Sequence, residues 1–325
     1  MTAVLTGAPA PTPPEPVIDL RKAVMSRKRR VRNSLASVLM VVAFLVAFVP
    51  LLFILWTVVS KGISVIRTDW FTKDIPDVAS FAAADNAKAF GIDPSTIQAA
   101  KPVYGMEPAI VGTLLTTGVA ALLAIPLGIM GAIYLNEYGK KGRLARMLRF
   151  FTDVMTGVPS VVMGVFLYTV FVVPQGTAGR SAIAGALALA CLMLPIVVRA
   201  TEEMLKLVPN TLREASAALG TRTWRTTVGV VLPAALPGVT SGCMLAIARA
   251  AGETAPILLT VGSTRFTNWS LGGVNTSLSR EIYANATQPG GDPLAWGAAF
   301  TLIAVVLVMT LLARFVTSKF ATRQT

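Results

Sequence analysis

The side chains best suited to act on a substrate lie in one apolar stretch near residue 250. Arg249 and Glu253 are four residues apart in the string ARAAGETAP, residues 248–256, so we expect them to share one face of a helix. An arginine can bind an oxyanion through two parallel hydrogen bonds, and Ser241 and Thr254 could add neutral donors. The pattern favours a positively charged binding site along the path of a transported anion, in which Glu253 orients Arg249 and moderates its charge.

A second interpretation of Arg249 and Glu253 stays open, namely an ion pair that only holds helices together. Other chemistry is not indicated by the composition. The chain has no histidine, and its two cysteines, Cys191 and Cys243, lie in apolar runs, where we expect small core residues rather than a disulfide framework or a metal site. The phosphate-loop pattern G-x-x-x-x-G-K-[ST] is absent. We therefore expect no enzyme activity of its own, no cofactor and no metal.

The elements that position these residues are predicted to be membrane helices. Hydrophobic residues make up 54% of the 325 residues and charged residues 14%, against about 25% charged in a soluble domain. A bilayer is crossed by about 20 helical residues. Six uncharged stretches approach or exceed that length: 33–60, 108–136, 154–179, 181–198, 226–248 and 293–313. The period-two alternation of a barrel strand is missing, so we predict an all-α polytopic protein with six transmembrane helices.

The domain organisation follows from these stretches. Residues 1–33 are Pro-rich and then basic, and are predicted to form a disordered cytoplasmic arm. Residues 34–59 form the first transmembrane helix, which we interpret as a retained anchor and not a cleaved signal. Residues 60–107 form an extracytoplasmic loop. A core over 108–320 then holds five transmembrane helices and a cytoplasmic loop at 199–233. Residues 263–292 form a second outer connection, rich in Asn, Ser, Thr and Gly.

The positions of Lys and Arg predict the orientation of the spans. The arm, the second-to-third connection, the fourth-to-fifth connection and the C-terminus together carry 20 of them, and the opposite side carries eight. Basic residues concentrate on the cytoplasmic side of membrane proteins, so both termini are predicted to be cytoplasmic. We therefore interpret the net charge of +13 as a determinant of membrane orientation, and we expect no nucleic-acid partner.

The cytoplasmic loop at 199–233 has the signals of two short helices at a sharp turn. Pro209 and Asn210 break an amphipathic segment, and Thr211 precedes Glu214 at the spacing of a capping box. A helix is predicted from Leu212 to Leu219, with Gly220 in the left-handed conformation at its end. A second short helix is predicted from about Arg222 to Leu232-Pro233. Together they would form a compact knob, although an ordinary helical loop would carry the same signals.

The sequence of this loop resembles the EAA signature of bacterial ABC importer permeases. Glu214-Ala-Ser216, Gly220 six residues after Glu214, and Val230-Val-Leu-Pro233 match the pattern E-A-A, three residues, G, nine residues, I-x-L-P, with Ser for Ala and Val for Ile as departures. The resemblance implies a type I ABC importer permease fold, in which the knob docks on a separate ATPase subunit. It implies the following coupling residues: Leu212, Arg213, Glu214, Ala215, Ala218, Leu219 and Gly220.

A narrower resemblance rests on ARAAGETAP at 248–256 and on GVPSVVMG at 157–164. Both are similar to the phosphate-specific permeases, of the PstA type rather than the PstC type, and the likeness covers about residues 105–320. It implies a permease subunit of the bacterial plasma (inner) membrane that imports inorganic phosphate. The implied partners are a PstC-like permease, PstB-like ATPase subunits and an external PstS-like phosphate-binding protein.

Three other functions stay open on the sequence. The same architecture could carry another oxyanion, such as sulfate or molybdate. An ion-gradient secondary transporter would need no ATPase, and the match at 214–233 would then be coincidental. A non-transporting membrane scaffold would leave the Arg249–Glu253 pair without a purpose.

Overall fold

The computed structural model describes residues 27–77, 104–139 and 142–321 of the chain. These divide into two units, with the boundary between Leu55 and Trp56. The first unit contains most of helix α1, Arg27–Gly62. Its side chains Leu39, Phe44 and Phe53 are exposed and apolar, as expected where the solvent is lipid. Residues 27–33 are helical, which corrects the prediction of a disordered arm for that part; residues 1–26 lie outside the described ranges.

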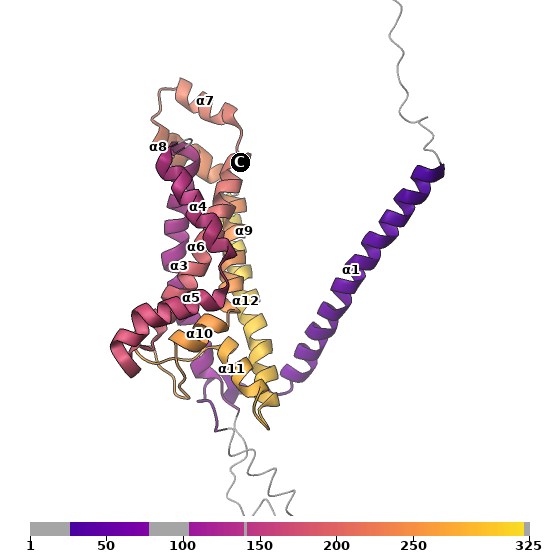
Figure 1. Ribbon diagram of the computed structural model, residues 1–325, viewed down its shortest axis with the longest axis vertical. Coiled ribbons are helices and arrows are strands. Elements are labelled where there is room, and N and C mark those ends of the chain that lie inside the picture. The colour runs from indigo at the N-terminus through magenta and orange to yellow at the C-terminus, as the bar shows by residue number, and fades with distance from the viewer. Residues whose placement is uncertain (1–26, 78–103, 140–141, 322–325) are drawn as a thin grey trace, which may run out of the picture. The chain divides into compact units, whose positions relative to one another are not determined.

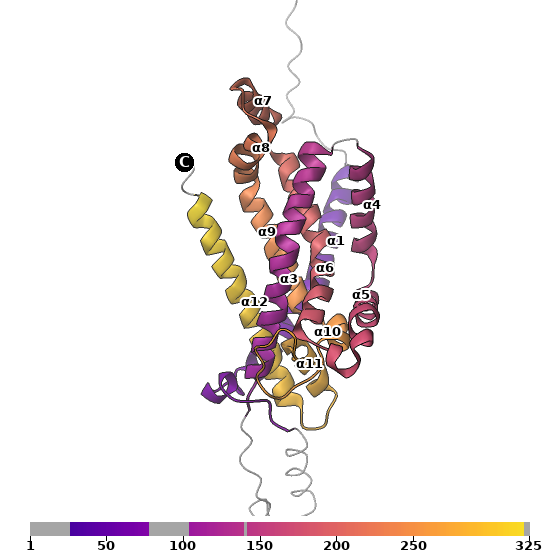
Figure 2. The same cartoon turned by 90° about the vertical axis from the view of Figure 1, so that its left-hand side faces the viewer.

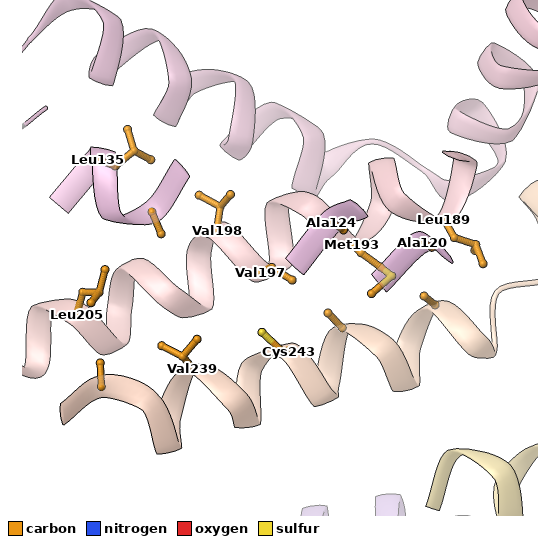
Figure 3. Packing of buried hydrophobic residues seen from close by; sticks show 14 of the residues in the cluster. Ala120, Ala124, Leu135, Leu189, Met193, Val197, Val198, Leu205, Val239 and Cys243 are labelled. Carbon is orange, nitrogen blue, oxygen red and sulfur yellow. The ribbon is translucent and has the colours of Figure 1, made fainter. Parts of the chain in front are cut away.

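The second unit is built around three helices that run side by side (Figures 1 and 2). They are α3 (Glu107–Ile133), α6 (Ala182–Leu207) and α9 (Leu232–Ala251). Figure 3 shows Ala120 and Ala124 of α3, Val197 of α6 and Cys243 of α9 among the buried side chains of this core. Cys243 is therefore a core residue, as predicted.

Small residues allow these helices to approach closely, which is how membrane helices gain packing energy. A Cβ atom added at Gly128 of α3 would lie 2.7 Å from the Val197 side chain of α6. One added at Gly242 of α9 would collide with Cβ of Ala200. The contacts of α6 with both neighbours thus depend on positions without a side chain.

Five helices in the described residues are long and apolar enough to cross a membrane. They cover Arg27–Gly62, Glu107–Tyr138, Ala182–Leu207, Thr223–Ala251 and Asp292–Phe315. A sixth span results if the bent pair Arg143–Gly157 and Ser160–Gly176 counts as one. Every regular element of the described ranges is helical. This all-helical architecture agrees with the predicted fold class.

The predicted third span, 154–179, is not one straight helix. The chain bends by 105° between α4 (Arg143–Gly157) and α5 (Ser160–Leu167). Val158 is extended, with ψ of 127°, because a residue before proline is disfavoured in the helical region and Pro159 lacks the N–H that would continue the ladder. After α5 the chain passes through a π-turn, η4 (Tyr168–Val172), and a 3-10 segment, η5 (Val173–Gly179).

The predicted helix break at Leu232-Pro233 is also wrong. Helix α8 (Thr223–Thr226) continues through the π-turn η6 (Thr227–Val231) directly into α9, which gives one span over Thr223–Ala251. Pro233 lies in the first turn of α9, and the wider π-turn before it accommodates the missing backbone donor.

The connections of the second unit gather at two opposite ends (Figures 1 and 2). At one end lie the π-turn η3 (Tyr134–Tyr138), helix α7 (Asn210–Ala218), α8 and the end of α12 (Asp292–Ala321). At the other end lie α10 (Ala255–Thr260) and α11 (Leu278–Ala286). Within the second unit, the second-to-third connection, the fourth-to-fifth connection and the C-terminal helix thus lie at one end, as the distribution of Lys and Arg predicts for these three segments.

The connection at 263–292, which the sequence predicts to be extracytoplasmic, folds back on the bundle, although its composition is polar. Asn275 and Thr276 are fully buried, and the hydroxyl of Thr276 donates to the buried Glu281 carboxylate over 2.6 Å. A second buried polar contact comes from the 3-10 turn η2 (Thr68–Phe71). It contains Trp70, whose indole N–H donates to the hydroxyl of Thr301 over 2.9 Å. Polar side chains that satisfy one another can be buried at little cost.

Candidate functional site

The loop at 208–222 begins with a change of chain direction. Val208 and Pro209 are extended, with ψ of 124° and 140°, and α7 starts at Asn210. No side chain caps its N-terminus, so the predicted capping box of Thr211 and Glu214 is wrong. Pro209 takes the N-cap position, which places Thr211 and Glu214 inside the helix.

The end of α7 has the predicted left-handed glycine. Gly220 has a φ of 75°, its N–H donates to the carbonyl of Ala217 over 2.9 Å, and the N–H of Thr221 donates to that of Ser216 over 3.4 Å. These two bonds form the motif that closes many helices before a left-handed residue. A Cβ added at Gly220 would meet nothing within 4 Å, so the backbone conformation alone requires glycine here.

Most of the predicted coupling residues point away from the bundle. Leu219 is 84% exposed and Leu212 is 41% exposed. The others that are exposed are Glu214, Ala215, Ala218 and Gly220. Leu212 and Leu219 thus leave apolar surface exposed on and directly after α7.

Arg213 differs from the other predicted coupling residues, because its guanidinium faces the ends of α3 and α6. It donates to the carboxylate of Glu137 in η3 over 2.9 Å, to the carbonyl of Leu205 over 2.9 Å and to that of Val208 over 2.7 Å. The side chains of Arg213 and Glu137 are 20% and 7% exposed. Sequence reasoning placed Arg213 on the docking face and did not identify Glu137 as its partner.

Ser216 holds the other side of α7. Its hydroxyl lies 2.6 Å from that of Thr221 and 2.9 Å from that of Thr226, and these two threonine hydroxyls are 3.0 Å apart. Ser216 is buried. The serine that departs from the E-A-A pattern therefore joins α7 to α8 through its contact with Thr226, and Thr221 closes a triangle of three hydroxyls with them.

The Arg249–Glu253 pair forms, but across the end of a helix. Helix α9 ends at Ala251, and Gly252 and Glu253 lie beyond it, so the prediction that both residues share one helix face is wrong. Nε of Arg249 lies 3.6 Å from Oε1 of Glu253, longer than a hydrogen bond. Pro256 in the first turn of α10 prevents the two helices from joining.

The break between α9 and α10 is supported by α11. The hydroxyl of Ser279 donates to the carbonyl of Glu253 over 3.0 Å, and the N–H of Glu253 donates to the carbonyl of Ala250 over 3.2 Å. Thr254, a predicted donor, is half-buried and serves as the N-cap of α10. The sequence contains no signal that would have identified Ser279, because its partner is a backbone atom 26 residues away.

One face of α9 is exposed along much of its length. Ser241, Leu245 and Arg249 are four residues apart and exposed, while Val239, Cys243 and Ala246 are buried in the core. We call Ser241, Leu245 and Arg249 the α9 stripe. The Arg249 side chain is 62% exposed, and in the described residues its guanidinium makes no hydrogen bond. The hydroxyl of Ser241 donates to the carbonyl of Pro237 over 3.0 Å, so this predicted donor is engaged within its own helix.

Residues 124–322 match the family described as binding-protein-dependent transport system inner membrane component. The match covers more than half of the chain. The chain belongs to this permease family. It is therefore a multi-pass inner membrane component of a transport system and not an ATPase.

The relatives of this permease narrow the family further. It is 43% identical over 312 residues to the phosphate transport system permease protein PstA 1 of Mycobacterium tuberculosis, and the match covers 94% of this chain and 96% of the relative. It is 38% identical over 293 residues to PstA of Yersinia pestis, covering 90% and 92%. With PstA of Haemophilus influenzae the identity is 35% over 288 residues, covering 88% and 94%. The permease is thus of the PstA type.

Two solved structures show the same fold. A bacterial ABC transporter involved in the import of the acidic polysaccharide alginate is 14% identical, with a TM-score of 0.56, covering 89% of this chain and 99% of the other. The inward-facing MetNI methionine ABC transporter is 19% identical, with a TM-score of 0.51, covering 67% and 94%. The permease therefore has the fold of ABC importer membrane subunits.

In this permease the α9 stripe lies on the continuous helix Thr223–Ala251, and the 208–222 loop leads directly into the α8 end of that helix. Ser216 holds α7 against α8, and α8 runs through η6 into α9, which carries Arg249 near its far end. A displacement of α7 along this element would therefore be passed to the Arg249–Glu253 break.

Proposed function

We propose that this chain is a transmembrane permease subunit of an ATP-driven importer of inorganic phosphate. The observation that carries the proposal is the exposed Arg249 on a membrane span of a PstA-type chain. A charged side chain facing hydrocarbon costs about 2.5–3.5 kcal/mol on insertion scales, so the face that bears Arg249 borders protein and a polar path. Its guanidinium donors, which make no hydrogen bond within the described residues, would bind a ligand outside this chain.

The chemistry of Arg249 fits an oxyanion. The planar guanidinium can give two parallel hydrogen bonds to a phosphate. Oε1 of Glu253 lies 3.6 Å from Nε of Arg249, which is close enough to reduce the local positive charge. The distance is too long for a hydrogen bond, so the guanidinium donors stay available to an anion. A binding site on a transport path needs moderate affinity, because an anion that is bound too strongly is not released.

The exposed α9 stripe supports a second, homologous permease as the partner in the membrane. Ser241, Leu245 and Arg249 need a cover that is neither lipid nor water alone. A PstC-like subunit facing the same path would supply it, and the two permeases would enclose the passage. An external PstS-like binding protein would then deliver phosphate to the end of the bundle that holds α10 and α11.

The energy source in this proposal is a separate pair of PstB-like ATPase subunits. The chain lacks a phosphate-loop motif, and α7 presents Leu212 and Leu219 to the outside. The end of the bundle that holds α7 would face the cytoplasm of a bacterium, together with both termini, as the positive charges favour.

Transport by the reconstituted complex tests the proposal. The two permeases and the ATPase are placed in liposomes with the binding protein, and ATP-dependent accumulation of radiolabelled phosphate is measured. We expect uptake that requires ATP, with an excess of sulfate or molybdate leaving it nearly unchanged. Uptake of sulfate or molybdate in place of phosphate would favour the alternative oxyanion, and uptake driven by an ion gradient without ATP would favour a secondary transporter.

A further inference from the structure

We propose that Arg213 and Glu137 form a clasp that makes α7 move as one body with the ends of α3 and α6. Arg213 is then a positioning residue for coupling and not a residue that touches the ATPase. This inference rests on the proposed function, because a clasp of this kind matters only if an ATPase acts on α7.

The backbone alone does not fix the orientation of α7. On its N-terminal side the chain is extended at Val208 and Pro209, which cap the two helices and interrupt the helical backbone between them. On its C-terminal side Gly220 is left-handed with open space around it. A helix of nine residues between two such points would tilt under load unless side chains hold it.

Arg213 provides the strongest hold on α7. Besides the Glu137 carboxylate, it reaches the carbonyls of Leu205 and Val208, and its Nη1 lies 3.3 Å from Oδ1 of Asn210. The two carbonyls belong to the last turn and the C-cap of α6, where the helix supplies few backbone donors; the Leu205 carbonyl also accepts from the N–H of Val208 over 3.4 Å. One guanidinium therefore joins α7, the end of α6 and η3.

The largely buried surroundings of Arg213 and Glu137 stabilise the contact between them. Glu137 is 7% exposed on its side chain, and its carboxylate also accepts from the amide of Asn136 over 2.8 Å. Removing one member of a buried pair leaves the other charge without a partner, which is far more costly than losing an exposed pair. The pair therefore stays closed while the loop is pushed or pulled.

The far side of the clasp is the packed core. Glu137 lies in η3, which directly continues α3, and α3 packs along α6 (Figure 2). A force on α7 would thus reach α3 and α6 through Arg213, and α9 through Ser216. Without the clasp, α7 would be held by Ser216 and by the extended backbone at Val208 and Pro209, and it could tilt about these points.

Two neutral substitutions and one matched control test the clasp. Arg213→Gln and Glu137→Gln each remove one charge of the pair, whereas Arg222→Gln removes a charge from an exposed side chain of the same loop. Each variant is assembled with its partners in liposomes, and two rates are measured, phosphate uptake and ATP hydrolysis. Their ratio is the readout, because a loss of folded protein lowers both rates equally and leaves the ratio unchanged.

We expect both clasp variants to co-purify with the ATPase and to hydrolyse ATP, with the phosphate taken up per ATP reduced by about tenfold. The control should keep the unaltered ratio. Arg213→Lys keeps the positive charge but lacks the several donors of the planar guanidinium, so its ratio of phosphate uptake to ATP hydrolysis should be intermediate. A ratio at the unaltered level in Arg213→Gln and Glu137→Gln would overturn the clasp, and so would failure of both to assemble, which would mark the pair as a folding element. Failure of the unaltered complex to take up phosphate would instead overturn the proposed function.

Discussion

Gly220 shows how a single residue determines the geometry of the 208–222 loop. Its φ of 75° lies where a side chain costs about 1–2 kcal/mol. Since the space around it is open, the penalty comes from the backbone and not from a clash. The turn that directs the chain from α7 to α8 thus depends on the absence of a Cβ atom at this position.

We expect Gly220→Ala to lower the free energy of unfolding of the loop by about 1 kcal/mol and to reduce ATP-driven uptake. Gly229→Ala is the matched control, since Gly229 also has open space for a Cβ but lies in the helical π-turn η6. Protection of the 208–222 amides from hydrogen exchange in the purified complex measures the effect. Equal protection in the two variants would contradict a backbone requirement at Gly220.

The residue types of the candidate site were predictable from the sequence, but their partners were not. Arg249 and Glu253 attract notice because charges are rare in apolar stretches. Arg213 has no such signal, because its partner Glu137 is 76 residues away and only the folded bundle brings them together. The sequence gives no signal for Ser279 either, because its hydroxyl donates to a backbone carbonyl of a distant residue. Spacing identifies local pairs, and contacts between distant elements require the structure.

Close packing determines how the helices of the core are arranged. The approach of α3 to α6 at Gly128 leaves no room for a methyl group, whereas Gly118 on the same helix has open space. Adding atoms to a packed core costs about 1–3 kcal/mol.

We therefore expect Gly128→Ala to lower the thermal stability of the complex, and Gly118→Ala, the matched control, to leave it unchanged or raise it slightly, because alanine is the better helix former. Thermal unfolding in detergent, followed by the loss of monodisperse complex on heating, compares them. A Gly128→Ala protein as stable as the control would show that Val197 can move aside.

The elements themselves were largely predictable, and the errors have a common cause. Length and apolar character identified the spans, because lipid imposes both. The third span bends at Val158-Pro159, and the fifth passes through Pro233 without a break. Proline lowers the stability of a helix in either case, and whether the chain bends or inserts a π-turn depends on the packing around it.

At the scale of the whole molecule, the two ends of the bundle should lie on opposite sides of the membrane. We expect a single cysteine at Ser318, in α12, to react with an impermeant maleimide only from the cytoplasm, and one at Thr287, just after α11, only from outside. Cys191 and Cys243 are first replaced by alanine. Labelling of both positions from the same side would contradict the topology on which the coupling account depends.

The central claim is that Arg249 acts on the transported anion and is not merely half of an ion pair. ATP-driven phosphate uptake at matched membrane levels in Arg249→Ala, Glu253→Ala and the double variant tests it most directly. Hydrogen bonds to a charged group contribute about 1.5–3 kcal/mol, so we predict that uptake falls roughly ten- to hundredfold in Arg249→Ala and stays equally low in the double variant. Restored uptake in the double variant, where neither stranded charge remains, would contradict a role for Arg249 toward the substrate.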